Sequence, residues 1–232
     1  MDGFTSIRRS IEHMKITVQK VIKGVRYLKH YGVKEFFIRL QEKMESENVP
    51  YEPWYEHHKA TEETLRRQRK QSAAWKGVPC VSIVVPLYNT PLEFLEELLD
   101  SVQNQTYQNW ELCCVDAGQD AAVGQKVQDR AKADPRIRYQ KLEKNELIPG
   151  NTNHGIEMAT GDYIALLDHD DILHPCALWY TAKAIAEQGA DFIYTDEATF
   201  EGSVDNVVLY HFKPDFMLDN LRSNNYICHL TL

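Results

Sequence analysis

A run of β-branched residues, VSIVVP at positions 81–86, decides the fold of this chain. Runs of this kind are typical of parallel strands that are buried on both faces of a sheet. Four later segments also give strand signals: WELCCV (110–115), IRYQKL (137–142), DYIALLD (162–168) and DFIYT (191–195). Helical segments alternate with these strands, and the alternation predicts an α/β fold in which helices flank a mostly parallel sheet.

The helices between the strands are marked by apolar periodicity and by their capping residues. The first begins after Thr90, which is expected to be its N-cap. Further helices are expected over residues 121–133, about 152–159 and 175–188. A polar helix that begins with Thr61 as its N-cap is expected ahead of the first strand.

Before residue 79 the chain has a different character. Apolar residues recur every three or four positions over residues 7–25, with Lys and Arg between them, and a second, shorter stripe covers residues 33–44. These patterns predict amphipathic helices. We therefore divide the chain into a basic helical extension and linker, residues 1–78, and an α/β domain, residues 79–232.

The two parts carry opposite charge. Residues 1–78 hold 16 Lys and Arg against 10 Asp and Glu, a net of +6, and the remainder holds 10 against 24, a net of −14. An acidic domain repels nucleic acid, and it would repel a phosphorylated substrate unless a cation stood between them. For residues 1–44 two hypotheses remain: peripheral contact with an anionic membrane surface, or docking on the chain's own domain or on a second copy in a homo-oligomer.

Several classes of protein are excluded. No apolar stretch approaches the roughly 18 to 20 residues that cross a bilayer, and MDGFTSIRRSIEHMK lacks the features of a secretory signal. The five cysteines form no C-x-x-C motif and are expected to be reduced and buried, and the nine histidines show no zinc-ligand spacing. A cytoplasmic location is expected, with contact at the inner face of the membrane as a further hypothesis.

Acidic residues fall where strands end. Asp116 follows the second strand, Asp168, Asp170 and Asp171 follow YIALL, and Asp196 and Glu197 follow FIYT. The carboxyl ends of parallel strands meet at one edge of the sheet, where ligands of such folds bind. Gathered carboxylates raise one another's pKa and destabilise the fold unless a cation neutralises them.

The segment Asp168-His169-Asp170-Asp171 is the strongest candidate for that cation. In an extended backbone Asp168 and Asp170 point to the same side and His169 points away. Carboxylate oxygens suit Mg²⁺ or Mn²⁺, which would complete its shell with water and phosphate oxygens. The alternative is that Asp170 or Asp171 caps the following helix, or that the acids form a solvated turn.

These motifs carry a family resemblance. VSIVVPLYNTPLEFLEELLDSVQNQTYQNWELCCVDAG, followed by ATGDYIALLDHDDILHPCAL, resembles the nucleotide-binding half of family 2 inverting glycosyltransferases, which have the GT-A fold. The likeness covers about residues 80–232, and PYEPWYEHHKATEE resembles the leader of bacterial members that act on surface polysaccharide.

The resemblance implies a donor, an acceptor and a set of site residues. The donor is a nucleotide-diphosphate sugar, UDP- or dTDP-linked, and the acceptor is a glycan; a divalent ion, Mg²⁺ or Mn²⁺, bridges to the diphosphate. The implied nucleotide-sugar-binding residues are Pro86, Tyr88, Asn89, Asp116, Asn153, Asp168 and His169, and the implied metal ligands are Asp168 and Asp170.

The chain departs from the family pattern in three places. Asp116-Ala117-Gly118-Gln119 replaces the usual pair of acids followed by Gly-Ser, so base recognition is expected to differ. The segment 146–150, ELIPG, replaces a small, Gly-rich stretch and alters the expected shape of the donor pocket. The sequence stops at Leu232, before the acceptor side and the usual general base, so the catalytic base is unassigned and Asp196 and Glu197 are its only nearby substitutes.

Three functions are therefore compared. The first is a metal-dependent glycosyltransferase domain of cell-surface polysaccharide assembly. The alternative is a non-catalytic module that binds a nucleotide sugar or regulates another protein. A third is a membrane-docking or oligomerising protein built on an inherited fold.

Overall fold

The computed structural model describes residues 25–29, 32–34, 36–37 and 51–232. The described residues before position 38 are helical, and the rest of the two amphipathic stripes predicted up to residue 44 lies outside the described residues. The chain divides into two compact units, Met1–Lys59 and Ala60–Leu232. The smaller unit contributes helix α3 (Tyr51–His58).

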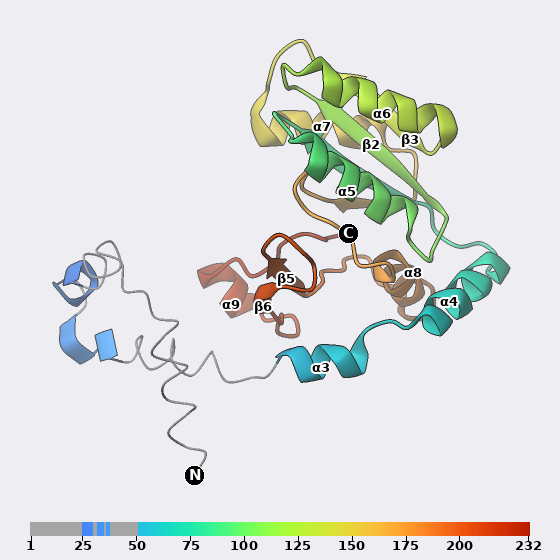
Figure 1. Ribbon diagram of the computed structural model, residues 1–232. Helices are drawn as coiled ribbons and strands as arrows, with labels where there is room; N and C mark the ends of the chain where they lie inside the picture. The colour runs from blue at the N-terminus through green and yellow to red at the C-terminus, as the bar shows by residue number, and fades with distance from the viewer. Residues whose placement is uncertain (1–24, 30–31, 35, 38–50) are drawn as a thin grey trace. The chain divides into compact units, whose positions relative to one another are not determined.

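The larger unit alternates strands and helices up to α8 and ends in a hairpin and a short helix (Figure 1). Its elements are α4 (Glu62–Ala74), β1 (Val81–Leu87), α5 (Leu92–Gln103), β2 (Trp110–Asp116), α6 (Ala121–Ala133), β3 (Ile137–Lys141), α7 (Leu147–Met158), β4 (Tyr163–Leu166), α8 (Ala177–Gln188), β5 (Glu197–Phe200), β6 (Val207–His211) and α9 (Leu218–Ser223).

Four strands form a parallel sheet in the order β3-β2-β1-β4, and β5 and β6 form a separate antiparallel pair. In the order of the sequence, β2 and β3 are added on one side of β1, and β4 is then added on the other side of β1. Because parallel crossovers are right-handed, this reversal puts α5 and α6 on one face and α7 on the other (Figure 1). The topological switch point therefore lies between β1 and β4.

The two central strands are buried on both faces, as their predominantly apolar sequences predict. On one face they pack against the apolar side of α5, which presents Leu95, Leu98 and Leu99. On the other face α7 lies very close, because Gly155 has no side chain; a Cβ there would overlap the Val84 side chain of β1. Helices thus cover both faces of the sheet, and the carboxyl ends of its strands are left for a ligand.

Helix α4 belongs to the larger unit. Thr61 caps it as expected, accepting a hydrogen bond from Thr64 N at 3.2 Å. The buried Gln68 side chain accepts a hydrogen bond from Thr106 Oγ1 at 2.8 Å, and Trp75 packs on Trp179 of α8 with ring centroids 5.6 Å apart. These contacts place the boundary between Lys59 and Ala60, whereas the sequence placed it between residues 78 and 79.

Two local predictions are wrong. Thr90 is not the N-cap of α5: Pro91 takes that position, one residue later, and Thr90 Oγ1 is buried without a hydrogen-bond partner among the described residues. Residues 191–195 do not form a full strand, because within the described part of the chain they pair only with Thr231 and Leu232, which bond to Tyr194 and Ile193.

Two helices begin elsewhere than expected. Helix α8 begins at Ala177 rather than at residue 175. Helix α7 spans Leu147–Met158 rather than about 152–159, because a hydrogen-bonded turn over residues 145–151 starts it earlier.

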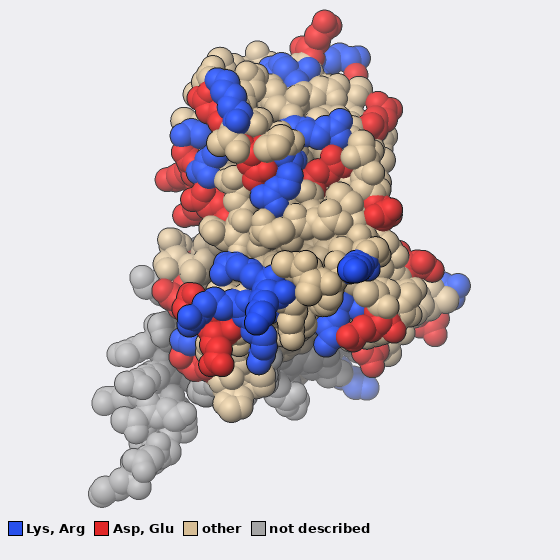
Figure 2. Space-filling model, turned by 90° about the vertical axis from the view of Figure 1, so that its right-hand side faces the viewer, with Lys and Arg blue, Asp and Glu red and all other residues tan. Residues whose placement is uncertain are grey.

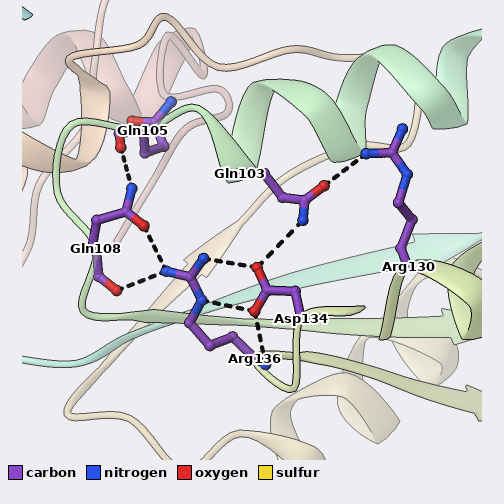
Figure 3. A network of polar contacts seen from close by, with 6 residues as sticks. All are labelled: Gln103, Gln105, Gln108, Arg130, Asp134 and Arg136. Atoms are coloured by element: carbon purple, nitrogen blue, oxygen red, sulfur yellow. Dashed lines mark hydrogen bonds and ion pairs between the residues drawn. The ribbon is translucent and has the colours of Figure 1, made fainter. Parts of the chain in front are cut away.

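The amino ends of the strands are held by polar side chains. Figure 3 shows one such network, in which Arg136 binds both carboxylate oxygens of Asp134 at 2.9 and 2.7 Å and also contacts Gln108. Arg130 donates to Gln103 at 2.7 Å, and Gln103 donates to Asp134 at 3.3 Å. These groups satisfy one another at the edge of the sheet opposite to the strands' carboxyl ends, so the network is structural.

A second anchor at the same edge is Glu111. Its carboxylate accepts hydrogen bonds from Ser82 Oγ of β1 at 2.7 Å, from Thr160 N at 2.5 Å and from Arg138 of β3 at 2.9 Å. These hydrogen bonds outweigh the effect of burial and hold the pKa of Glu111 at about 2, below the usual 4.5. One side chain thus joins three strands and the turn that leads into β4.

The prediction that the five cysteines are reduced and buried holds for three of them and is wrong on burial for the other two. Among the five cysteines, all free, Cys113, Cys114 and Cys176 are buried, and Cys80 and Cys228 are partly exposed. Figure 2 looks onto the face that carries the basic helix α4, and Lys and Arg side chains gather there with Asp and Glu beside them. None of the described helices has the length and apolar character needed to cross a bilayer.

Candidate functional site

A cavity of about 530 Å³ opens at the switch point of the sheet. It is bounded by the carboxyl ends of β1 and β4 and by the turn that begins α7. The lining residues are Pro86, Tyr88, Asn145, Leu147, Ile148, Pro149, Asn151, Asp168, His169 and Asp170. Ligand cavities in proteins commonly measure about 300 to 1,000 Å³, so this one has room for a nucleotide-sized molecule.

The acidic end of this site is built by a turn after β4. Asp171 N donates to Asp168 O at 3.3 Å, and this turn replaces the extended backbone that the sequence predicted for residues 168–170. As a result Asp168 and Asp171 come together, and His229 joins them from the end of the chain. Ligand atoms of these three residues lie within 4.8 Å of one another.

Asp168, Asp171 and His229 shift one another's pKa. His229 Nδ1 lies 3.1 Å from Asp168 Oδ2; this contact lowers the pKa of Asp168 and raises the pKa of His229 above their usual values. Desolvation, together with the carboxylates of Asp170 and Asp168, raises the pKa of Asp171. Like charges are therefore concentrated beside the cavity, which is an arrangement typical of a cation site.

The other two residues of the DHDD segment lie on the cavity wall. Asp170 is exposed, and His169 is half-buried with its Nδ1 atom buried and without a hydrogen-bond partner among the described residues. Neither Asp170 nor Asp171 caps α8, whose N-cap is Cys176, so the capping alternative does not hold. The other alternative, a turn open to solvent, describes the local backbone, because Asp170 and Asp171 are both exposed in it.

Of the site residues predicted at the end of β1, two line the cavity and one does not. Pro86 and the exposed Tyr88 line the cavity. Asn89, with a φ of 53°, is exposed and is not among the lining residues. It approaches the loop after β2, where a Cβ on Gly118 would lie 3.0 Å from Asn89 N.

Asp116 is buried beneath this loop, and both of its carboxylate oxygens accept hydrogen bonds. Its carboxylate accepts hydrogen bonds from Gly118 N at 2.8 Å, from Tyr139 Oη at 2.7 Å and from Lys141 Nζ at 2.9 Å. The residue is 1% exposed and does not line the cavity. In this structure Asp116 fixes the end of β2 and the loop that follows.

The sequence reasoning missed the residues that build the turn before α7. Asn151 is 3% exposed; its Oδ1 accepts from Glu146 N at 3.0 Å, and its Nδ2 donates to Asn145 Oδ1 at 2.9 Å. Asn153, which the resemblance implied, is exposed and lies away from the lining. Asparagine is frequent in tight turns because its side chain bonds the nearby backbone, and that signal was available in Asn145 and Asn151.

The two acids considered as substitute bases are held by Lys213. Lys213 N donates to Asp196 Oδ1 at 2.6 Å, and Lys213 Nζ lies 2.7 Å from Glu197 Oε1. Burial alone would raise the pKa of Glu197, but its hydrogen bonds with Lys213 and His211 hold that pKa below the usual value. A base needs a pKa near the working pH, so this environment disfavours Glu197 in that role.

Comparisons with known proteins identify the family. The family model described as "Glycosyl transferase family 2" matches residues 82–228. The chain therefore belongs to glycosyl transferase family 2. The expected α/β class, with parallel strands flanked by helices as in the GT-A fold, is confirmed.

Similar proteins include longer bacterial chains. The chain is 44% identical to the uncharacterized protein y4gI of Sinorhizobium fredii over 66% of its own length and 17% of that protein. It is 32% identical to the O-antigen biosynthesis protein RfbC of Myxococcus xanthus over 65% of its own length and 12% of that protein. The chain thus spans less than a fifth of either relative.

Among solved structures, S. aureus TarS 1–349 gives a TM-score of 0.45 at 25% identity, with 49% of this chain and 34% of that chain covered.

Proposed function

We propose that this family 2 domain binds a nucleotide-diphosphate sugar in the cavity through a divalent ion and transfers the sugar to a glycan acceptor of the cell envelope. The observation that carries the proposal is the cluster of Asp168, Asp171 and His229, which lies beside a nucleotide-sized cavity at the switch point of the sheet. The net charge of −14 after residue 78 adds a reason, because a diphosphate needs a cation between itself and an acidic domain.

The three residues of the cluster fit a divalent ion. Two carboxylates and one imidazole offer oxygen and nitrogen ligands, and an imidazole favours a transition metal such as Mn²⁺ over Mg²⁺. A bound divalent ion would neutralise charge on the departing nucleoside diphosphate. We assign Asp168, Asp171 and His229 to holding it, and Asp170 and His169, on the cavity wall, to hydroxyl groups of the donor.

The remaining predicted residues take two kinds of role in this proposal. Pro86 and Tyr88 contact the nucleotide directly, because they line the cavity. Asp116 and Asn89 act by positioning: Asp116 anchors the loop at Gly118, and Asn89 lies against that loop. Neither of these two side chains is assigned a contact with the donor.

The test measures nucleotide binding by the whole chain. Unfolding temperature and calorimetric affinity are followed with UDP and dTDP, each with Mn²⁺ and with EDTA. A ligand at 100 times its Kd adds about 2.7 kcal/mol of stability, so we expect a clear rise in the unfolding temperature only when nucleotide and metal are both present. Asp168→Asn should remove it, and Asp191→Asn, a change at an exposed acid away from the lining residues, should not.

Two results would contradict the proposal. Equal affinity for UDP in Mn²⁺ and in EDTA would exclude the metal bridge. Failure of the wild-type chain to bind any nucleoside diphosphate would exclude donor binding altogether.

A non-catalytic nucleotide-sugar-binding module is a second candidate. It is favoured by the engagement of Asp196 and Glu197 with Lys213, which leaves neither acid well suited to deprotonate an acceptor. Positioned general-base catalysis is worth about 10²- to 10⁴-fold. Donor binding with only slow hydrolysis would favour the module, whereas transfer to added oligosaccharides at about 1 per second or faster would favour the enzyme.

A further inference from the structure

Leu147 has an unusual backbone conformation for its residue type. It has a φ of 65°, in the left-handed region that bulky side chains rarely adopt. Nothing about helix formation requires this conformation, and a glycine would adopt it freely. A bulky residue kept in such a conformation at a cavity suggests that the side chain itself is needed there.

The turn that contains Leu147 is held by hydrogen bonds to side chains. Leu147 N donates to Asn145 Oδ1 at 2.9 Å, and the same oxygen accepts from Asn151 Nδ2 at 2.9 Å. Gly150 allows the turn to close, because a Cβ there would lie 2.5 Å from Glu146 Cβ. These contacts keep Leu147 in its left-handed conformation.

The side chains presented by this turn are apolar and open to solvent. Leu147 is 71% exposed and Ile148 is 74% exposed, yet both line the cavity together with Pro149. We call Leu147–Pro149 the apolar lip. Exposed side chains of this size, gathered at a cavity mouth, lose contact with water only when a ligand covers them.

The lip and the acids come from different elements around the same cavity. The lip is the first turn of α7, which packs against β1 and β2, and the acids follow β4. A nucleoside diphosphate likewise has a charged part, the diphosphate, and a flat, uncharged part, the base. Pro86 and Tyr88 add to the uncharged lining of the cavity.

We propose, on the basis of the function proposed above, that the apolar lip covers the nucleobase of the bound nucleoside diphosphate, and that Leu147 is kept in a left-handed conformation to place it there. Leu147 is then an affinity-determining residue that makes no contact with the reacting atoms. Its strain lowers the stability of the free protein, and its contact with the base strengthens binding.

Two variants of the whole chain distinguish the backbone strain at Leu147 from the contact of its side chain with the base. Leu147→Gly removes the side chain and relieves the left-handed strain, whereas Leu147→Ala removes most of the side chain and keeps the strain. In the presence of Mn²⁺ we expect both variants to bind UDP at least about tenfold more weakly than the wild type, as the loss of a buried leucine contact implies. Only Leu147→Gly should unfold at a higher urea concentration than the wild type.

Two controls localise the effect. Inorganic pyrophosphate has no base, so its Mn²⁺-dependent affinity should be the same in the wild type and both variants. Leu218 is also an exposed leucine at the first position of a helix, and it lies away from the lining residues. Leu218→Gly should leave UDP affinity unchanged and should not raise the urea midpoint.

The outcomes distinguish the lip from the function on which it rests. Unchanged UDP affinity in the Leu147 variants, with a wild type that binds UDP, overturns the lip alone. An equal loss of pyrophosphate and UDP affinity also overturns it, because the lip would then act on the phosphates. A wild type that binds neither ligand overturns both the lip and the proposed function.

Discussion

At the carboxyl end of β4, a single backbone hydrogen bond determines which carboxylates meet. The bond from Asp171 N to Asp168 O closes a turn and brings these two side chains beside His229. Alternation along a strand would have paired Asp168 with Asp170 instead. The metal ligands proposed from the structure and those predicted from the sequence therefore differ by one acid and one histidine.

This difference gives a prediction at the scale of single residues. Asp171→Asn and His229→Gln should each weaken Mn²⁺-dependent UDP binding by at least about tenfold, or 1.4 kcal/mol, because each removes a ligand of the ion. Asp170→Asn should have a smaller effect. Calorimetric titration at fixed Mn²⁺ measures all three, and a loss confined to Asp170→Asn would restore the ligand pair predicted from the sequence.

The sequence predicted most of the site at the level of segments and less of it at the level of residues. Strand ends locate the cavity, since Pro86, Tyr88 and the DHDD segment all line it or lie beside it. His229 could not be predicted, because it reaches the site from a position about 60 residues further along the chain through tertiary packing. Asn89, Asp116 and Asn153 lie outside the lining.

Elements were predicted well where they are buried. The runs of apolar residues in β1 and β2 identify these strands without a structure, since only a fully covered strand tolerates them. The prediction failed for residues 191–195, which form one bridge and a neighbouring pair of backbone hydrogen bonds rather than a ladder. A strand needs a partner of matching length, and local sequence carries no information about the partner.

At the scale of elements, Glu111 predicts how stability depends on pH. Its pKa is about 2 in the folded chain and about 4.5 when unperturbed. A lowered pKa means that the charged form stabilises the fold above pH 4.5 and that this contribution is lost as the pH falls from 4.5 toward 2. The side chain is 10% exposed, and the contribution is at most about 3 kcal/mol.

Urea unfolding of Glu111→Gln at several pH values tests this. The variant should be less stable at pH 7, because Arg138 loses its carboxylate partner and keeps only Met158 O as an acceptor among the described residues. Its stability should fall less steeply than that of the wild type below pH 4.5. Glu143→Gln, a change at an exposed glutamate, serves as the control. Parallel pH profiles for wild type and Glu111→Gln would show that other acids govern the acid sensitivity.

For the whole molecule, the charge division along the chain makes membrane contact testable. Residues 1–44 hold ten Lys and Arg against four Asp and Glu. If they bind a membrane surface, the chain should sediment with anionic vesicles and be released by salt, since such attraction is screened over about 8 to 10 Å. Deletion of residues 1–44 should then abolish sedimentation; aggregation of the deleted chain without any change in vesicle binding would favour docking on the protein itself.

The distribution of the cysteines gives the molecule a reporter of its own site. Burial raises the pKa of Cys113, Cys114 and Cys176, so these thiols are poorly reactive. Cys228 is only partly buried and directly precedes His229. Burial also raises the pKa of Cys80, but Cys80 and Cys228 are the two partly exposed thiols. We therefore expect an alkylating reagent to modify these two accessible thiols first, and Mn²⁺ with UDP to slow modification of Cys228 but not of Cys80. The rate, followed by mass spectrometry of peptides, would then report occupancy in the unaltered chain without any label.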